Sequence, residues 1–234
     1  MSNRFTRQET SALGEIKPKT SNMEKFKAEK GKKYRLGFPL LNENGKVRID
    51  RVYYFDKFEN KEGGIKIKTI IPKDCTDDQI DQIISKLGEP KYRYVTPVIV
   101  YGTDNNGVIQ KPLSYKIVPL VIADGILADL SSINDEFPLS DHDITVSLKE
   151  GTDPKYQNLS IFPTSKQAIW KNEKIQDKIQ EEVNEVAKEM HKAVASEMSC
   201  SAIMEKIGLN SSSSEYTQSG NTVSEDDIDI DDLV

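Results

Sequence analysis

The chain has 234 residues, of which 36% are hydrophobic and 30% charged, so we expect part of its length to lie outside any packed core. No run of about 18 apolar residues is present, which excludes a membrane-spanning helix, and the polar first 20 residues predict no secretory signal. Residues 1–116 carry a net charge of +8 and residues 117–234 one of −14, which favours a body that binds a polyanion and carries an acidic appendage.

The first region, residues 1–23, is rich in serine, threonine and lysine and predicts a flexible basic arm. The folded body is expected over residues 24–165, where short β-type runs alternate with turn dipeptides such as Asn44-Gly45. The runs that predict strands are 34–38, 47–55, 65–71, 92–101, 113–121, 143–148 and 156–162.

Two helices are predicted among these strands. Thr76 and Gln79 form a capping box, an apolar stripe that includes Ile83 follows, and Gly88 ends the first helix. A second short helix is predicted over residues 124–133. Many short strands with inserted helices predict an α+β fold that is mainly β, built around a small barrel of the oligonucleotide/oligosaccharide-binding (OB) type.

Residues 166–208 change to a helical pattern. The apolar residues recur every three or four positions, which predicts one long amphipathic helix. The helix either docks on its own domain or serves self-association or a partner. The stripe consists of Ile175, Ile179, Val183, Val186, Met190, Val194 and Met198.

Residues 209–234 predict a disordered tail, in which a serine-rich linker precedes an acidic end. Six carboxylates lie among the last ten residues without a base. The tail either solubilises the protein or binds a partner through its alternating aliphatic residues. The candidate partner-binding residues are Asp226, Asp227, Ile228, Asp229, Ile230, Asp231, Asp232 and Leu233.

Catalytic and metal-binding patterns are missing from the sequence. His142 and His191 do not lie at metal-ligand spacing from a cysteine, and no phosphate-binding glycine loop or nucleophile elbow occurs. Residues 141–143 (Asp-His-Asp) are interpreted as a solvated strand entry. We therefore expect no enzyme, no metal and no cofactor, with an unrecognised carboxylate site as the remaining enzymatic alternative. The two cysteines, Cys75 and Cys200, favour a reducing cytoplasm and exclude a disulfide-rich scaffold.

Basic and aromatic residues interleave through the body. Phosphates require a cationic track, and unpaired bases stack on aromatic rings, so this combination is typical of proteins that bind single-stranded nucleic acid. The candidate phosphate contacts are Lys32, Lys33, Arg35, Arg48, Arg51, Lys66, Lys68, Arg93 and Lys116. The candidate stacking rings are Tyr34, Tyr53, Tyr92, Tyr94 and Tyr101.

The run Lys32-Lys33-Tyr34-Arg35-Leu36-Gly37-Phe38-Pro39 resembles the opening strand of bacteriophage single-stranded DNA-binding proteins. Residues 143–151 and 156–164 resemble their closing hairpin, and the acidic end resembles their tail. The resemblance implies an OB-type barrel and a replication, recombination or repair setting in which the tail recruits partner enzymes. The chain differs from the T-even phage members, because Cys75 and Cys200 cannot supply their zinc site.

The sequence thus predicts a cytoplasmic, non-enzymatic protein that coats single-stranded DNA without strong sequence preference and that could self-associate on it. The residue pattern itself fits DNA and RNA alike. The alternative is a transcription or assembly accessory protein that acts through its C-terminal helix and acidic tail.

Overall fold

The computed structural model describes residues 23–58, 66–151, 153 and 157–209, without the side chains of residues 165 and 166. The predicted basic arm, apart from Met23, and the predicted acidic tail, apart from Leu209, lie outside the described residues, as does Tyr156. Within the described part, no helix is long and apolar enough to cross a membrane.

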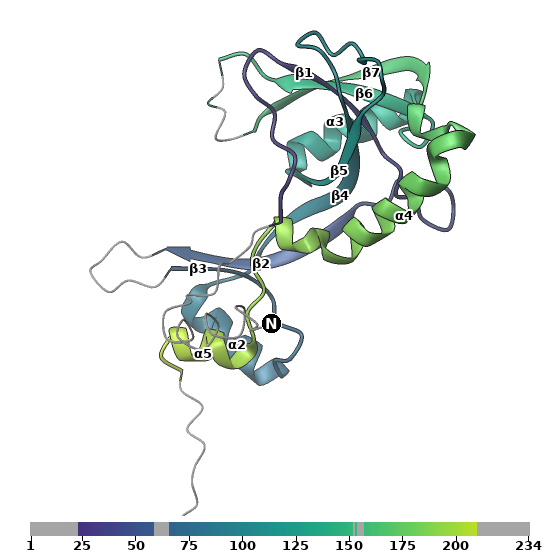
Figure 1. Cartoon of the computed structure of the whole chain (residues 1–234). Helices are drawn as coiled ribbons and strands as arrows, with labels where there is room; N and C mark the ends of the chain where they lie inside the picture. Colours follow the sequence, from purple (N-terminus) through teal and green to yellow (C-terminus); the bar gives the residue numbers. More distant parts are fainter. Residues whose placement is uncertain (1–22, 59–65, 152, 154–156, 210–234) are drawn as a thin grey trace, which may run out of the picture.

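The fold is mixed α/β, built on one antiparallel sheet (Figure 1). Its seven strands are β1 (Lys33–Gly37), β2 (Asp50–Phe58), β3 (Lys66–Ile70), β4 (Lys91–Tyr101), β5 (Tyr115–Ile122), β6 (His142–Leu148) and β7 (Leu159–Gln167). Five of them lie in the order β5-β4-β1-β6-β7, and β2 pairs with both β4 and β3. Among the described residues β5 and β7 do not pair, so the closed barrel is not confirmed.

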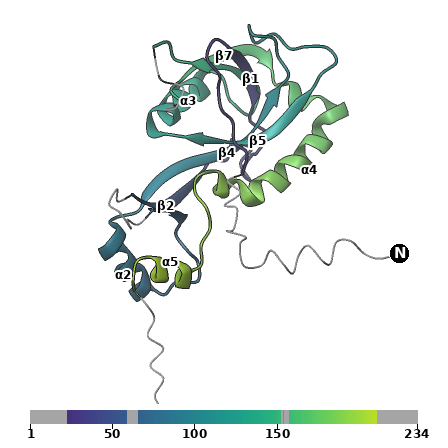
Figure 2. The same cartoon turned by 60° about the vertical axis from the view of Figure 1, so that its left-hand side comes forward.

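Strand β4 joins two lobes. Its second half pairs with β1, as in Leu36 with Val100, and its first half pairs along the same edge with β2, as in Tyr53 with Tyr92. Strand β5 follows the other edge of β4. The sheet therefore continues along β4 from the main body into a smaller lobe that contains the β2–β3 hairpin (Figures 1 and 2).

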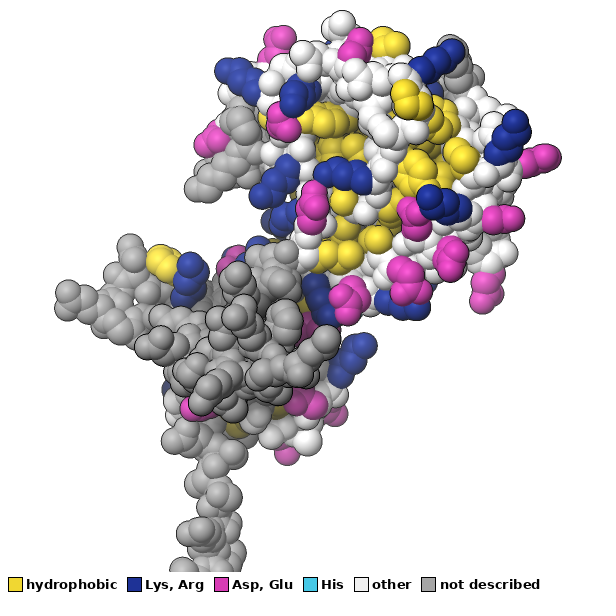
Figure 3. All heavy atoms as spheres, in the orientation of Figure 1, with side chains coloured by type: hydrophobic (Ala, Val, Ile, Leu, Met, Phe, Trp, Pro, Cys, Tyr) yellow, Lys and Arg dark blue, Asp and Glu magenta, His cyan; other side chains and the backbone are white. Residues whose placement is uncertain are grey.

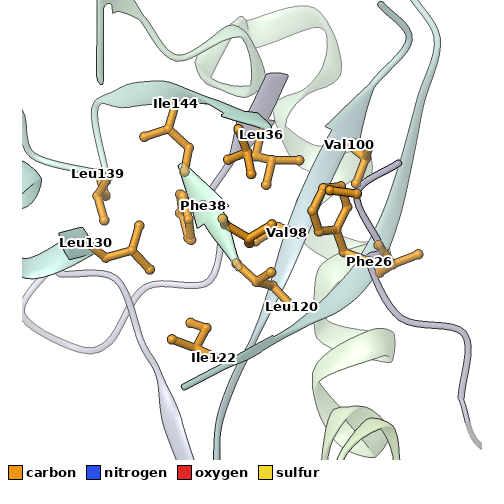
Figure 4. Packing of buried hydrophobic residues seen from close by; sticks show 14 residues of the cluster. Phe26, Leu36, Phe38, Val98, Val100, Leu120, Ile122, Leu130, Leu139 and Ile144 are labelled. Carbon is orange, nitrogen blue, oxygen red and sulfur yellow. The ribbon is translucent and has the colours of Figure 1, made fainter. Parts of the chain in front are cut away.

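The core of the main body lies on one face of the sheet. Helix α3 (Asp124–Glu136) covers this face with Leu130, which packs with strand residues such as Leu36, Val98 and Ile144 (Figure 4). These strand residues alternate with residues of the opposite face, as the period of a β-strand requires. The predicted second helix is confirmed and ends three residues later than expected.

An extended segment, residues 24–29, fills the space between β5 and the start of β7. The Phe26 N–H donates to the carbonyl of Pro119 on β5 over 2.9 Å, and the Gln157 side chain exchanges two hydrogen bonds with the backbone of Ala28. Phe26 and Ala28 are buried in the core of the main body. The segment thus covers the opening that the missing β5–β7 pairing leaves.

The opposite face of the sheet is covered by the C-terminal part of the chain. Helix α4 (Glu173–Glu189) buries Ile179 and Val183 completely, and the 3-10 helix η2 (Ile169–Lys171) buries Trp170. These residues share a second core with Val95 and other residues of β2 and β4.

The prediction of one long helix over residues 166–208 is wrong. Helix α4 ends at Glu189 and is followed by the 3-10 helix η3 (Met190–Ala193), an irregular segment and the short helix α5 (Cys200–Lys206). Val194 packs in the core under α4, whereas Met198 packs in the small lobe. The residues of the apolar stripe pack into two separate cores, and the helix is interrupted between the residues of the first core and those of the second.

The small lobe packs helix α2 (Asp77–Leu87) and α5 against the β2–β3 hairpin. Its core contains Phe55, Ile67, Ile83 and Ile203. The capping box of α2 is confirmed, since the Thr76 side chain accepts from the backbone of residue 79 and its backbone N–H donates to the Gln79 side chain.

A disulfide bond joins Cys75, which precedes the cap of α2, to Cys200, the first residue of α5, with 5.2 Å between the two Cα atoms. The sequence analysis excluded a disulfide-rich scaffold and did not predict this single bond. The separation of the two cysteines by 125 residues concealed the contact, which arises because α5 returns to the lobe that contains β2, β3 and α2. The Asp74 carboxylate, next to Cys75, accepts from the Cys200 N–H over 3.1 Å.

Candidate nucleic-acid interface

Four of the predicted site residues meet on one face of the sheet, where β2 pairs with β4. Arg51 pairs with Tyr94, and Tyr53 pairs with Tyr92, and directly paired residues point to the same face. On this face the core under α3 ends at Tyr94, and the core of the small lobe begins at Phe55. The four side chains, which we call the Arg51–tyrosine cluster, therefore lie between two covered regions.

The three tyrosines of the cluster surround one guanidinium. The Arg51 side chain donates to the hydroxyl of Tyr94 over 2.8 Å and to that of Tyr53 over 3.2 Å. Its central carbon lies 5.0 Å from the ring centre of Tyr92 and 5.2 Å from that of Tyr94, within the range of cation–π contacts. The hydrogen bonds to Tyr53 and Tyr94 raise the pKa of Arg51 above the already high value of an arginine, so the side chain stays protonated.

The rings contact each other edge to face, at 6.0 Å between Tyr53 and Tyr92 and 5.7 Å between Tyr92 and Tyr94. Tyr53 is 42% exposed and Tyr92 36% exposed. The Tyr92 hydroxyl donates to Asp124 at the start of α3 over 3.4 Å. The sequence interpretation missed the contribution of Asp124, because its contact depends on the return of the chain after β5. Two partly exposed rings beside a fixed cation can take a stacked base and its phosphate.

Three predicted phosphate contacts lie on the opposite face. Arg93 pairs with Val52, and Lys68 and Lys66 pair with Asp56 and Phe58. Lys68 lies over the ring of Tyr54 at 5.4 Å, and Lys66 lies over that of Phe58 at 5.9 Å. The alternation of side chains along β2, β3 and β4 therefore separates these cations from the Arg51–tyrosine cluster.

The residues of the first strand lie at the far end of β4 from the cluster. Lys32 forms an exposed ion pair with Glu29 at 2.5 Å and, with Lys33, lines a pocket next to the β6–β7 connection. The Tyr34 ring packs edge-on against Phe26 at 5.3 Å. Two further predicted cations form exposed ion pairs, Arg48 with Asp50 and Lys116 with Glu24.

The structure corrects the predicted roles of Tyr101 as a stacking ring and of Arg35 as a phosphate contact. Tyr101 is only 2% exposed, so no base can stack on it. Its hydroxyl accepts from the backbone N–H of Trp170 and donates to the carboxylate of Asp143, and burial raises the pKa of this hydroxyl. The Arg35 side chain is 14% exposed and binds the same carboxylate over 3.3 Å.

Asp143 is therefore a structural residue of the buried face rather than part of a solvated strand entry. Its side chain is fully buried and also accepts from the Ile169 N–H over 3.2 Å. Burial raises the pKa of this carboxyl, against the opposing effects of the Ile169 hydrogen bond and the Arg35 charge.

Basic side chains are visible in the indentation between the main body and the β2–β3 hairpin (Figure 3). Within residues 23–58, 66–151, 153 and 157–209, no group of three His, Cys, Asp or Glu side chains is placed to hold a metal ion. No protein family model, curated protein or solved structure matches the chain.

Proposed function

We propose that the protein binds single-stranded DNA without strong sequence preference, through the Arg51–tyrosine cluster, and that it acts as a coat rather than as an enzyme. The observation that carries this proposal is the convergence of Arg51 with three tyrosines between the two lobes. Stacking on such rings contributes about 1–3 kcal/mol per base and tolerates any base, because every base has a flat face.

The strand order supports an OB-like arrangement. The five strands β5-β4-β1-β6-β7, with α3 between β5 and β6, follow the order of an OB fold in which one closing pair is absent. In this view the β2–β3 hairpin and α2 are an insertion between the first two strands. The resemblance to bacteriophage single-stranded DNA-binding proteins agrees with this arrangement and supports a role in replication, recombination or repair.

Helix α4 explains why the proposed interface lies outside the OB-like part of the sheet. OB folds bind oligonucleotides on the face of their second and third strands, which correspond here to β4 and β5. That face is covered, because Ile179 and Val183 of α4 are fully buried against it. We therefore propose that the DNA strand binds along the first half of β4, where β4 pairs with β2.

The acidic segment 225–234 has a role in the same proposal. A tethered polyanion competes with DNA for a cationic surface at high effective concentration. When DNA displaces the segment, Ile228, Ile230 and Leu233 become available to a partner enzyme. The partner is then recruited only where the protein coats DNA.

Fluorescence anisotropy with a labelled single-stranded oligonucleotide tests the interface. We expect the affinity to fall linearly on a log–log plot as salt rises and to increase when residues 211–234 are deleted. Tyr53→Ala and Tyr92→Ala should each weaken binding by about 5-fold to 150-fold, the equivalent of one stacked base.

Two matched controls use residues outside the cluster. Phe162→Ala removes a ring on β7 that is 56% exposed, and Lys68→Gln removes a cation from the opposite face of the hairpin; both should bind like the wild type. If full-length and truncated proteins fail to bind single strands, or if their affinity ignores salt, the proposal is wrong.

A second candidate function is an accessory protein for transcription or assembly, which would bind a polymerase through its C-terminal part. It predicts that reversing the charge of residues 225–232 abolishes function while Tyr92→Ala has no effect. The packing of α4 on its own sheet disfavours it, because the apolar face of that helix is already occupied.

A further inference from the structure

A pocket of about 800 Å³ opens beside the Arg51–tyrosine cluster, within the range of small-molecule sites, about 300–1,000 Å³. Its walls come from β2, the segment after β3, η3 and the segment before α5. Arg51 and Tyr53 line it as well, so pocket and cluster share two residues. The main apolar side chains are those of Val52, Ile71, Met190 and Met198.

One edge of the pocket is backbone without a strand partner. The pairing of β2 with β3 begins at Tyr54, so no described strand pairs with residues 50–53 on the edge away from β4. The Tyr53 carbonyl points to that edge, since it accepts from the Ile71 N–H over 3.3 Å. Every second residue of a strand directs its N–H and C=O to the same edge, so the backbone groups of Arg51 also face the pocket.

The acidic side chains that line the pocket already have partners. Arg48 binds Asp50 at 2.7 Å, His191 binds Glu197 at 2.7 Å, and Asp74 accepts from the backbone of α5. The pocket therefore offers no unpartnered carboxylate among its described residues, and the charged side chains left for a ligand there are the cations Arg51 and Lys73. Its apolar walls and its backbone donor and acceptor suit a flat, uncharged ring system with a polar edge.

We propose that this pocket receives one unpaired nucleobase of the bound strand. The sugar–phosphate chain stays beside Arg51, neighbouring bases stack on Tyr53 and Tyr92, and one base turns past Tyr53 between Met190 and Met198. The polar edge of that base then meets the backbone of Arg51. This inference rests on the proposed function and adds to it a site that holds a base by both its faces and its edge.

Methionine methyl NMR tests the pocket directly, because the chain has only five methionines. Met190 and Met198 line the pocket, and Met204 lies in the core of the small lobe as an internal control. With ¹³C-methyl methionine in the full chain, a single-stranded oligonucleotide should shift the Met190 and Met198 signals and leave Met204 in place. An abasic strand with the same phosphates should shift neither.

A filling variant gives the second measurement. Met198→Trp occupies the pocket and should weaken oligonucleotide binding about tenfold, with the salt dependence unchanged. Met204→Leu is the matched core control and should bind normally. If Met198→Trp does not fold, as judged by circular dichroism, the NMR comparison alone decides.

The outcomes separate the two proposals. Salt-dependent binding without movement of the Met190 and Met198 signals, or with the same movement on the abasic strand, overturns the base pocket and leaves the Arg51–tyrosine interface standing. Absence of any binding by the wild type overturns both.

Discussion

Breaking the disulfide between Cys75 and Cys200 is expected to lower the free energy of unfolding by up to about 5 kcal/mol. The bond closes a loop of 125 residues, and the chain-entropy relation for a loop of that length gives about 5 kcal/mol at 25 °C. The effect should be concentrated in the small lobe, whose core has only seven buried residues in the described part of the chain. Without the bond, α5 is held by the core contacts of Ile203, Met204 and Ile207 and by the Asp74 hydrogen bond.

Urea unfolding measures the global effect. The single tryptophan, Trp170, is 2% exposed in the main body, so its fluorescence reports that body, while circular dichroism reports the helices. The oxidised wild type is compared with the thiol-reduced wild type and with the Cys75→Ser/Cys200→Ser variant. Reductant should have no effect on the double variant, which is the control.

Hydrogen exchange locates the change. We expect amide exchange in α2 and α5 to accelerate more than in β4 or β6 when the disulfide is absent. If the free energies of the oxidised and reduced proteins agree within about 1 kcal/mol, and the exchange of α5 does not change, the reasoning from loop closure is refuted.

Four further outcomes follow from the buried face and from α2. Asp143→Ala should cost about 3–5 kcal/mol in chemical unfolding, because it leaves the Arg35 charge and the Tyr101 hydroxyl buried without their acceptor; a cost below about 1 kcal/mol would contradict the buried pair. Gly37→Ala should cost about 1–3 kcal/mol, since its Cβ would lie 2.9 Å from both Asp143 Oδ1 and the Tyr101 hydroxyl, whereas Gly125→Ala, with open space around its Cβ, serves as control. Thr76→Ala should cost about 1 kcal/mol by removing the cap of α2, and Thr76→Ser should restore most of it. Because burial raises the pKa of Asp143, its protonation favours the folded state: this contribution is complete below the pKa of an unfolded aspartate, about 3.9, and is lost as pH rises through the raised folded pKa. Thermal unfolding of Asp143→Asn against pH should lack that loss, and an unchanged profile would refute the assignment.

The strands and the first two helices were predictable because their signals are local. Residues 144–148 alternate apolar and polar residues, and the capping box at Thr76 marks the start of α2 within four residues. Such patterns depend only on the period of the element and on its end groups.

The faces of β4 could not be predicted in the same way. Val95, Val98, Ile99 and Val100 are all buried, because α3 covers one side of this strand and α4 the other. A strand that is apolar on both faces carries no alternation to show where Tyr94 and Tyr101 point. The sequence therefore offered these tyrosines as candidates for the proposed interface without separating the partly exposed ones from the buried Tyr101.

The division of the C-terminal region was hidden for a related reason. Apolar residues at helical spacing predict that one face of the helix is buried, but they do not predict which part of the protein that face packs against. Val194 and Met198 continue the stripe but belong to different cores. The same return of the chain brings Cys200 to Cys75.

The segment 24–29, which lies along β5 and reaches Gln157, has a consequence for how copies of the protein behave toward one another. A strand edge that keeps its carbonyls and N–H groups uncovered invites pairing with the edge of another molecule. The backbone N–H of Phe26 donates to the carbonyl of Pro119, and the Phe26 side chain is buried, so the segment prevents such pairing at this edge of β5. A chain shortened to begin at residue 30 would expose this seam, and its molecules would associate edge to edge and precipitate instead of remaining dispersed.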